Sequence, residues 1–335
     1  MKRIISLLLA LALTLSLTAC TAPAEKADGG KLQIVTTLFP YYDFARAIAQ
    51  DHADVTLLLS PGREAHSFEP TPLDAVTISE ADVFLYNGGE GEYWVESMLD
   101  AAGEHIAVAS RMMDYVDALN EEYVEGMQGA DGHDHDHEHG SHDDHDHDHE
   151  EDEHDSDEIE YDEHIWTSPK NAVVLCRAVC DAICRADAEN AAFYRANCEN
   201  YCAQLEDLDA RFAALCESAP RRLLIFADRF PMLYFCREYG LDYRAAFHGC
   251  SGDTEPSLAT IKFLIDKVED ENIPVVYTID FGTKKVAAVV SECTGAAIET
   301  LYSMQTVSRA DFDAGETYLT LMERNFEALR KGLNA

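Results

Sequence analysis

Short apolar runs alternate with amphipathic segments along most of this 335-residue chain. In the first half, mainly apolar runs of strand length occur at 32–36, 55–59, 83–86 and 105–109. The segments between them space their apolar side chains as a helix does, at 41–50, 72–80 and 92–102. The alternation resumes beyond Pro220 at 223–226, 232–239, 243–247, 257–269, 275–279, 284–294, 297–301 and 317–333. Strand and helix in near-strict alternation predict parallel sheets covered by helices on both faces.

One helical segment is much longer than the others. Residues 188–217 contain neither Gly nor Pro and carry apolar side chains on one broad face. At 1.5 Å per residue, such a helix is roughly 45 Å long, enough to run across two lobes. A capping Ser168 followed by Pro169 opens the helix before it. We therefore predict an α/β fold of two lobes joined by a long spine helix.

The N-terminus has the features of an export signal. Two basic residues precede an apolar stretch at 4–17 that is too short to span a bilayer comfortably, and Leu17-Thr18-Ala19-Cys20 resembles a bacterial lipobox. We expect 1–19 to be a lipoprotein signal peptide and 20–31 to be an acylated cysteine, Cys20, with a flexible linker. No other apolar run approaches 18 residues, so the expected place is the extracytoplasmic face of a bacterial cell membrane, anchored by lipid.

The most unusual segment is rich in histidine and carboxylate. Between Gly132 and His154 lie nine histidines, interleaved with Asp and Glu. They are His133, His135, His137, His139, His142, His145, His147, His149 and His154. Imidazole and carboxylate are ligands of divalent transition metals, and a segment with almost no apolar side chains cannot bury itself. We expect residues 130–160 to form a disordered insertion whose histidines, the His-rich tract, collect metal ions weakly.

The charge distribution narrows the range of partners. The formal net charge is −38, and residues 130–163 contribute eighteen acidic and no basic side chains to it. The rest of the chain is also acidic, which argues against nucleic acid or anionic lipid headgroups as partners and suits a cation as ligand. The expected domains are an N-terminal lobe at 32–186, which contains the insertion, a spine helix at 187–218 and a C-terminal lobe at 219–335.

Nine cysteines besides Cys20 are spread over the predicted lobes. Several recur every fourth residue, at Cys176, Cys180 and Cys184 and again at Cys198 and Cys202. Helical residues four apart share a face, but that geometry is poor for a disulfide bond. We interpret these cysteines as small apolar core residues in preference to a redox or metal site.

Two motifs resemble those of a known family. Residues 61–72, PGREAHSFEPTP, and 162–169, DEHIWTSP, are similar to the two histidine motifs of the metal receptors of ABC importers, in the zinc and manganese cluster. Tyr239-Gly240-Leu241 and Glu255-Pro256-Ser257 resemble two further landmarks of the second lobe. The resemblance covers roughly residues 32–335 and implies a two-lobed receptor, and a His-rich acidic insertion is typical of the zinc branch.

The resemblance implies that His66 and His164 bind the metal in a cleft between the lobes. Neutral imidazole favours Zn²⁺, and Asp162 or Glu163 would hold His164 by accepting its other N–H. The family supplies a third His or a Glu before Tyr239, where this chain reads FADRFPMLYF at 226–235. Asp228 in that segment is our predicted third ligand.

Other side chains compete for the remaining positions of the metal. His248 ends another predicted strand of the second lobe and is the alternative third ligand. Glu64 or a water molecule is expected in the fourth position, with Asp280 in reserve. The aspartate of the family's manganese receptors aligns, without gaps, with Thr283 or Lys284, which makes the manganese arrangement doubtful here.

The implied function is capture of Zn²⁺, in preference to Mn²⁺, and its delivery to an ABC permease and its ATPase by a monomeric, membrane-anchored receptor. The alternative is a surface metal buffer or sensor that is not coupled to transport; such a buffer would need only the His-rich tract. An enzyme is not expected. The metalloprotease motif H-E-x-x-H is absent, because Glu153 occupies the place of the second histidine after His149 and Glu150.

Overall fold

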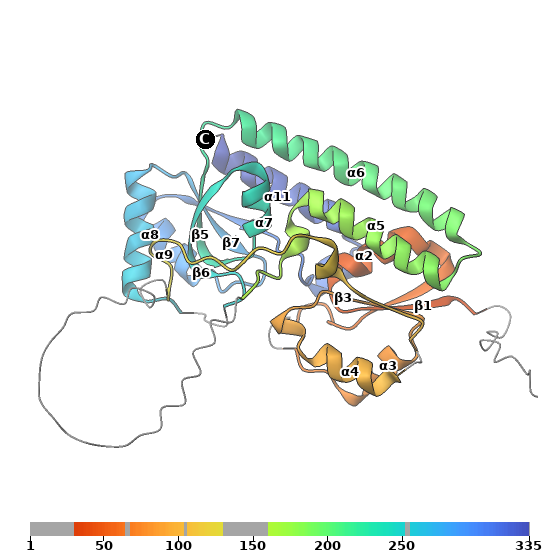
Figure 1. Cartoon of the computed structure of the whole chain (residues 1–335). Coiled ribbons are helices and arrows are strands. Elements are labelled where there is room, and N and C mark those ends of the chain that lie inside the picture. Colours follow the sequence, from red (N-terminus) through yellow and green to blue (C-terminus); the bar gives the residue numbers. More distant parts are fainter. Residues whose placement is uncertain (1–29, 64–67, 104–105, 130–159, 252–254, 335) are drawn as a thin grey trace, which may run out of the picture. The chain divides into compact units, whose positions relative to one another are not determined.

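The computed structural model describes residues 30–63, 68–103, 106–129, 160–251 and 255–334, which contain two four-stranded sheets (Figure 1). The first sheet consists of β1 (Leu32–Thr36), β2 (Ala53–Leu57), β3 (Val83–Tyr86) and β4 (Val108–Arg111). The second consists of β5 (Leu223–Phe230), β6 (Asp242–His248), β7 (Val275–Ile279) and β8 (Ala297–Leu301). All pairings are parallel, in the orders β2-β1-β3-β4 and β6-β5-β7-β8, so the predicted α/β class with parallel sheets is confirmed.

Helices cover both sheets. In the first lobe they are α2 (Phe39–Ala49), α3 (Pro72–Ser79), α4 (Trp94–Ala102) and α5 (Pro169–Ala186). In the second they are α7 (Leu233–Tyr239), α8 (Leu258–Asp270), α9 (Lys285–Thr294), α10 (Arg309–Asp313) and α11 (Tyr318–Leu333). The predicted cap of α5 is present, since the Ser168 side chain accepts from the Asn171 N–H. Among the described residues, no helix has the length and apolar character needed to cross a membrane.

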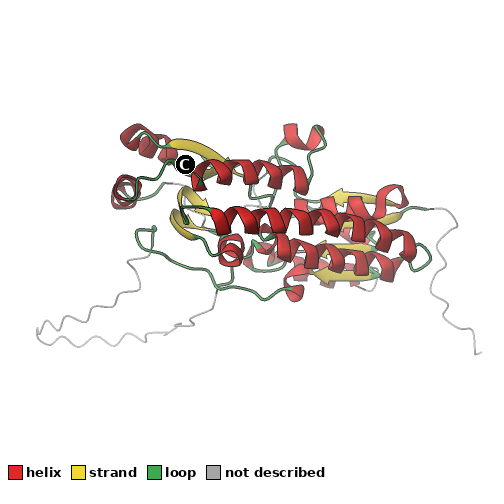
Figure 2. Ribbon diagram, turned by 90° about the horizontal axis from the view of Figure 1, so that it is seen from above, coloured by secondary structure: helices red, strands yellow, loops and turns green. Residues whose placement is uncertain are grey.

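The predicted long helix is α6 (Ala191–Ser218), whose 28 residues give it a length of about 42 Å. It packs against α2 and α5 of the first lobe and against α7 and α11 of the second, and Figure 2 shows it side by side with α5 and α11. It begins a few residues later than its composition suggested. Asp187 accepts hydrogen bonds from the Asn190 N–H (3.3 Å) and the Tyr194 hydroxyl (2.6 Å), which hold the preceding residues in a turn.

Two buried aromatic side chains connect the lobes. The indole Nε1–H of Trp166 donates to the Ser303 carbonyl (2.7 Å), and the Tyr318 hydroxyl donates to the Trp166 carbonyl (2.7 Å). The Tyr318 N–H in turn donates to the buried carboxylate of Asp43 (2.9 Å). Trp166 lies two residues after the predicted ligand His164. These hydrogen bonds therefore fix the position of that histidine relative to the second sheet.

Replacement of Trp166 by phenylalanine is expected to lower the free energy of unfolding by about 1–3 kcal/mol, because the buried Ser303 carbonyl would lose its donor. Trp94 provides a matched control, since its buried Nε1 has no hydrogen-bond partner. The Trp94→Phe change should therefore lower the free energy of unfolding clearly less. Urea unfolding of both variants measures the difference, and equal losses would show that the bond to Ser303 contributes nothing.

Candidate metal centre

Each sheet reverses its strand order once, between β1 and β3 and between β5 and β7. Open parallel sheets form their ligand crevices at such points, beyond the carboxyl ends of the strands. Two small cavities of about 20 Å³ lie there, each with room for about one water molecule. The first is lined by residues that include Thr37, Asn87, Glu92, Glu163 and Gln305. The second is lined by residues that include His164, Arg229, Asp280, Ser303 and Gln305.

His164 is buried beside the second cavity, and Asp162 holds it. Asp162 Oδ1 accepts the backbone N–H of His164 (2.7 Å) and lies 3.1 Å from its Nδ1. An Nδ1–H donated to this carboxylate leaves the lone pair of the imidazole on Nε2, the nitrogen that a metal would use. Burial alone would lower the pKa of His164. The negative charges of Asp162 and of the more distant Glu121 and Glu163 have the larger effect, so the pKa is raised.

The carboxylates around His164 fit a cation. Asp162 Oδ2 is buried and has no hydrogen-bond partner. Glu163 turns away from the imidazole, because its Oε1 accepts the N–H of Gly91 (2.8 Å). Of the two residues expected to orient His164, Asp162 therefore makes the contact. Burial raises the pKa of Glu163, with only partial compensation from Gly91 and His164. A cation would offset the repulsion among these carboxylates.

Asp280 directly follows β7 and lines the same cavity as His164. Its Oδ1 accepts the N–H of Ser303 (3.1 Å), which holds the carboxyl at the edge of the sheet. Burial raises the pKa of Asp280 to about 6, and the nearby Asp228 contributes to the increase. A carboxylate that is costly to ionise in the empty site is suited to a divalent cation.

Asp228 lies within β5, which extends further than its sequence suggested. The register against β6 shifts between Phe226 and Arg229, so a β-bulge places Asp228 beside the end of β7. Its Oδ2 accepts from the Thr278 hydroxyl (2.7 Å), and its Oδ1 accepts from the Arg229 N–H (2.9 Å). Asp228 is not among the described residues that line the cavity with His164. It lies instead beneath the turn that carries Asp280, where Gly282 leaves no room for a Cβ.

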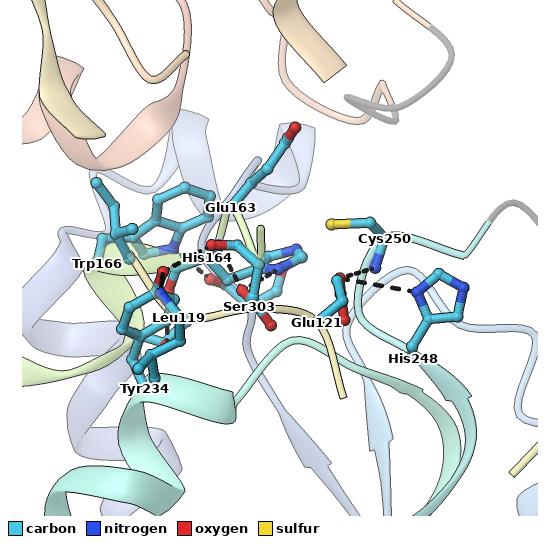
Figure 3. A network of polar contacts seen from close by, with 12 residues as sticks. Leu119, Glu121, Glu163, His164, Trp166, Tyr234, His248, Cys250 and Ser303 are labelled. Carbon is cyan, nitrogen blue, oxygen red and sulfur yellow. Dashed lines mark hydrogen bonds and ion pairs between the residues drawn. The ribbon is translucent and has the colours of Figure 1, made fainter. Parts of the chain in front are cut away.

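His248 is the last residue of β6 and faces a carboxylate that the sequence reasoning missed. Its Nδ1 lies 3.7 Å from Oε1 of Glu121, which also accepts the Cys250 N–H (3.1 Å). Figure 3 shows Glu121 between His164 and His248. Burial would raise the pKa of Glu121, but His248, Cys250 and the charge of His164 lower it to about 2. The only sequence signal for Glu121 was its place in an acidic stretch ahead of the His-rich tract.

Several predicted residues lie outside the described residues: His66, Glu64, Cys20 and the nine histidines of the His-rich tract. The described neighbours of His66 lie at the cleft. The Gly62 N–H donates to the Val307 carbonyl of the second half of the chain (2.8 Å), and Phe68 lines the first cavity together with Glu163.

Comparison with known proteins identifies relatives over most of the chain. The family model described as ZnuA, zinc-uptake complex component A, periplasmic, matches residues 34–332. The chain is 31% identical over 316 residues to the high-affinity zinc uptake system protein ZnuA of Bacillus subtilis (strain 168), covering 93% of this chain and 91% of that protein. It is 30% identical over 334 residues to the zinc-binding lipoprotein AdcA of Streptococcus pneumoniae (strain R6), covering 99% of this chain but 61% of the longer relative.

A solved structure supports the same relationship. The Zn(II)-bound ZnuA-like domain of Streptococcus pneumoniae AdcA superposes with a TM-score of 0.70 at 26% sequence identity, covering 91% of this chain and all of that domain. The two-lobed arrangement with a long helix is thus shared with this structure. The chain belongs to the family of the periplasmic zinc-uptake complex component A, ZnuA.

Proposed function

We propose that this chain captures Zn²⁺ outside the cytoplasm, in the cleft between its lobes, and delivers it to an ABC permease and its ATPase. The observation that carries the proposal is the placement of His164, which Asp162 orients and which shares a cavity with Asp280 of the second lobe. One imidazole and one carboxylate from opposite lobes form half of a tetrahedral zinc shell. Family membership supports the transport role, and the relatives named for zinc support the choice of metal.

We propose His66 as the second imidazole ligand, on the strength of its motif and of its described neighbours at the cleft. For the carboxylate we favour Asp280 over Asp228. Asp280 lines the cavity with His164, whereas both oxygens of Asp228 accept hydrogen bonds from its own lobe. His248, which pairs with Glu121, and Glu64 are the remaining candidates for the fourth position.

Zinc affinity is expected to fall as the pH drops through neutrality and below about 6. The pKa of His164 is raised above its usual value, so its imidazole takes up a proton first as the pH falls, and Asp280, whose pKa is raised to about 6, follows at lower pH when no metal is bound. Zinc must displace those protons, so affinity should decrease roughly tenfold per pH unit for each proton released. Calorimetry between about pH 5 and pH 8 measures the slope, and a constant affinity would contradict the assignment of these two ligands.

The His-rich tract is proposed to gather Zn²⁺ weakly and to raise its concentration near the cleft. Deletion of residues 133–154 is expected to remove several weak zinc sites and to leave one tight site, since the cleft ligands lie outside this tract. Equilibrium dialysis of the full-length chain and of the chain without residues 133–154 counts the weak and the tight zinc sites. Loss of the tight site on deletion would show that the tract itself supplies tight ligands.

We propose attachment to the membrane through an acylated Cys20 and action as a monomer. The lipobox supports the anchor, as does the name of the lipoprotein relative AdcA. The proposed function as a whole is tested by zinc-limited growth of cells that lack the chain. Growth should be rescued by the chain and not by its His164→Ala form, and equal rescue by both would exclude the cleft as the transport site.

A further inference from the structure

Five cysteine side chains meet where α5 packs against α6, and none of them lines the two cavities of the zinc cleft. They are Cys176, Cys180 and Cys184 of α5 and Cys198 and Cys202 of α6, all of them buried. The Sγ atoms of Cys176, Cys198 and Cys202 all lie within 4.8 Å of one another. None of the nine cysteines in the described part of the chain is in a disulfide.

The sulfur positions are close to those of a metal–thiolate site. Four thiolates around Zn²⁺ with bonds of about 2.3 Å place neighbouring sulfurs about 3.8 Å apart. The Sγ atoms of Cys198 and Cys202 are 3.8 Å apart. The Cys180 thiol interacts with Cys198 and can supply a fourth sulfur.

The surroundings of the sulfurs favour a soft cation over other ligands. The three-sulfur group contains no carboxylate or imidazole, and thiolate ligands select Zn²⁺ and Cu(I) over hard cations.

Simple packing does not require this arrangement. Alanine would fill a close helix contact equally well, as Ala178 and Ala182 do elsewhere along α5. A disulfide between residues four apart on one helix has poor geometry, which leaves the pairs within each helix as thiols. What distinguishes the cluster is the convergence of sulfurs from both helices on one point.

We propose that Cys176, Cys198 and Cys202, with Cys180 as the fourth sulfur, form a second metal site for a thiophilic d¹⁰ cation such as Zn²⁺. Each ligating thiol releases its proton to solvent as its sulfur–metal bond forms. The bound ion would join α5 of the first lobe to the spine helix α6, and would serve stability instead of transport. Because the sulfurs are buried, the ion is loaded as the chain folds and exchanges slowly afterwards.

The test uses Cd²⁺, which replaces Zn²⁺ and gives an ultraviolet charge-transfer absorption only with thiolate ligands, so binding by histidines and carboxylates is silent. The reduced full-length chain is refolded with Cd²⁺, and the excess ion is removed. We expect one thiolate-bound Cd²⁺ per chain, together with a higher unfolding temperature than that of the metal-free chain. The absorption should be lost in Cys198→Ala and in Cys202→Ala, and the thermal shift should be smaller in both, because Cd²⁺ bound in the cleft still stabilises these variants.

Two matched variants serve as controls. Cys236→Ala removes a buried cysteine of the second lobe, and Cys293→Ala removes an exposed one, so both should retain the absorption. The circular dichroism of each metal-free variant establishes that it folds. The proposal is overturned if the reduced wild-type chain shows no thiolate absorption, or if the absorption survives in a folded Cys198→Ala or Cys202→Ala chain. Zinc transport through the cleft would be unaffected by either result.

Discussion

Asparagine in place of Asp280 is expected to weaken zinc binding in the cleft more than about 100-fold. Removal of a partner that only orients a ligand typically costs 10–100-fold in metal affinity, and loss of a directly bound carboxylate should cost more. Asp280 is the carboxylate of the second lobe that lines the cavity with His164. Calorimetry with Zn²⁺ on the chain without its His-rich tract measures the change, since the weak sites are then absent.

The same variant should be more stable than the parent when no metal is bound. The folded-state pKa of Asp280 is about 6, above its ordinary value, so the folded protein holds a proton that the unfolded chain has already released. Stability from this group is present at low pH and is lost as the pH rises through about 6. Asparagine cannot ionise, so we expect a gain of about 1–3 kcal/mol at pH 8 that disappears towards pH 4.

Asp228→Asn is the matched control, because it changes the neighbouring carboxylate in the same way. The substitution should weaken the hydrogen bond from Thr278 and loosen the turn that carries Asp280, and we expect a smaller loss of zinc affinity than in Asp280→Asn. If Asp228→Asn abolishes binding while Asp280→Asn retains it, Asp228 is the ligand and the order proposed here is reversed.

The second large change in zinc affinity is expected on substitution of Asp162. Its carboxylate fixes the tautomer and the orientation of His164, so Asp162→Asn should lower zinc affinity 10–100-fold. The pKa of His164 should fall in the same variant, because Asp162 is the main group that raises it. Nuclear magnetic resonance titration of the imidazole provides this second readout, which a purely structural role would leave unchanged.

Glu163→Gln is the control for Asp162. Glu163 Oε1 accepts from the Gly91 N–H and faces away from the imidazole, so its amide should alter zinc affinity much less. Equal losses in the two variants would mean that total negative charge, and not the orientation of His164, determines affinity.

Much of the fold could be predicted because helix and strand periods are local properties of the sequence. The alternation of segments gave the two parallel sheets, and the absence of Gly and Pro gave α6. The ends of helices and strands were harder to predict where a tertiary contact determines them. β5 continues to Phe230 because a bulge allows it to stay paired with β6, and no residue pattern announces that bulge.

The site was only partly predictable for the same reason. His164 and its partner Asp162 are close in sequence, so a motif could identify both. Asp280 and Glu121 approach His164 only after both lobes have folded, and each is a single carboxylate in a strongly acidic chain. Alignment without gaps pointed to Thr283 or Lys284, whereas the carboxylate at the end of β7 is Asp280.

Zinc and manganese calorimetry on residues 31–335 without the His-rich tract tests the central claim most directly, beside His66→Ala and His164→Ala. We predict one tight zinc site, lost in both variants, and weak manganese binding. The absence of a tight zinc site would contradict the proposed receptor function and favour a metal buffer that acts through the His-rich tract alone. A tight site that survives both substitutions would exclude the cleft between the lobes.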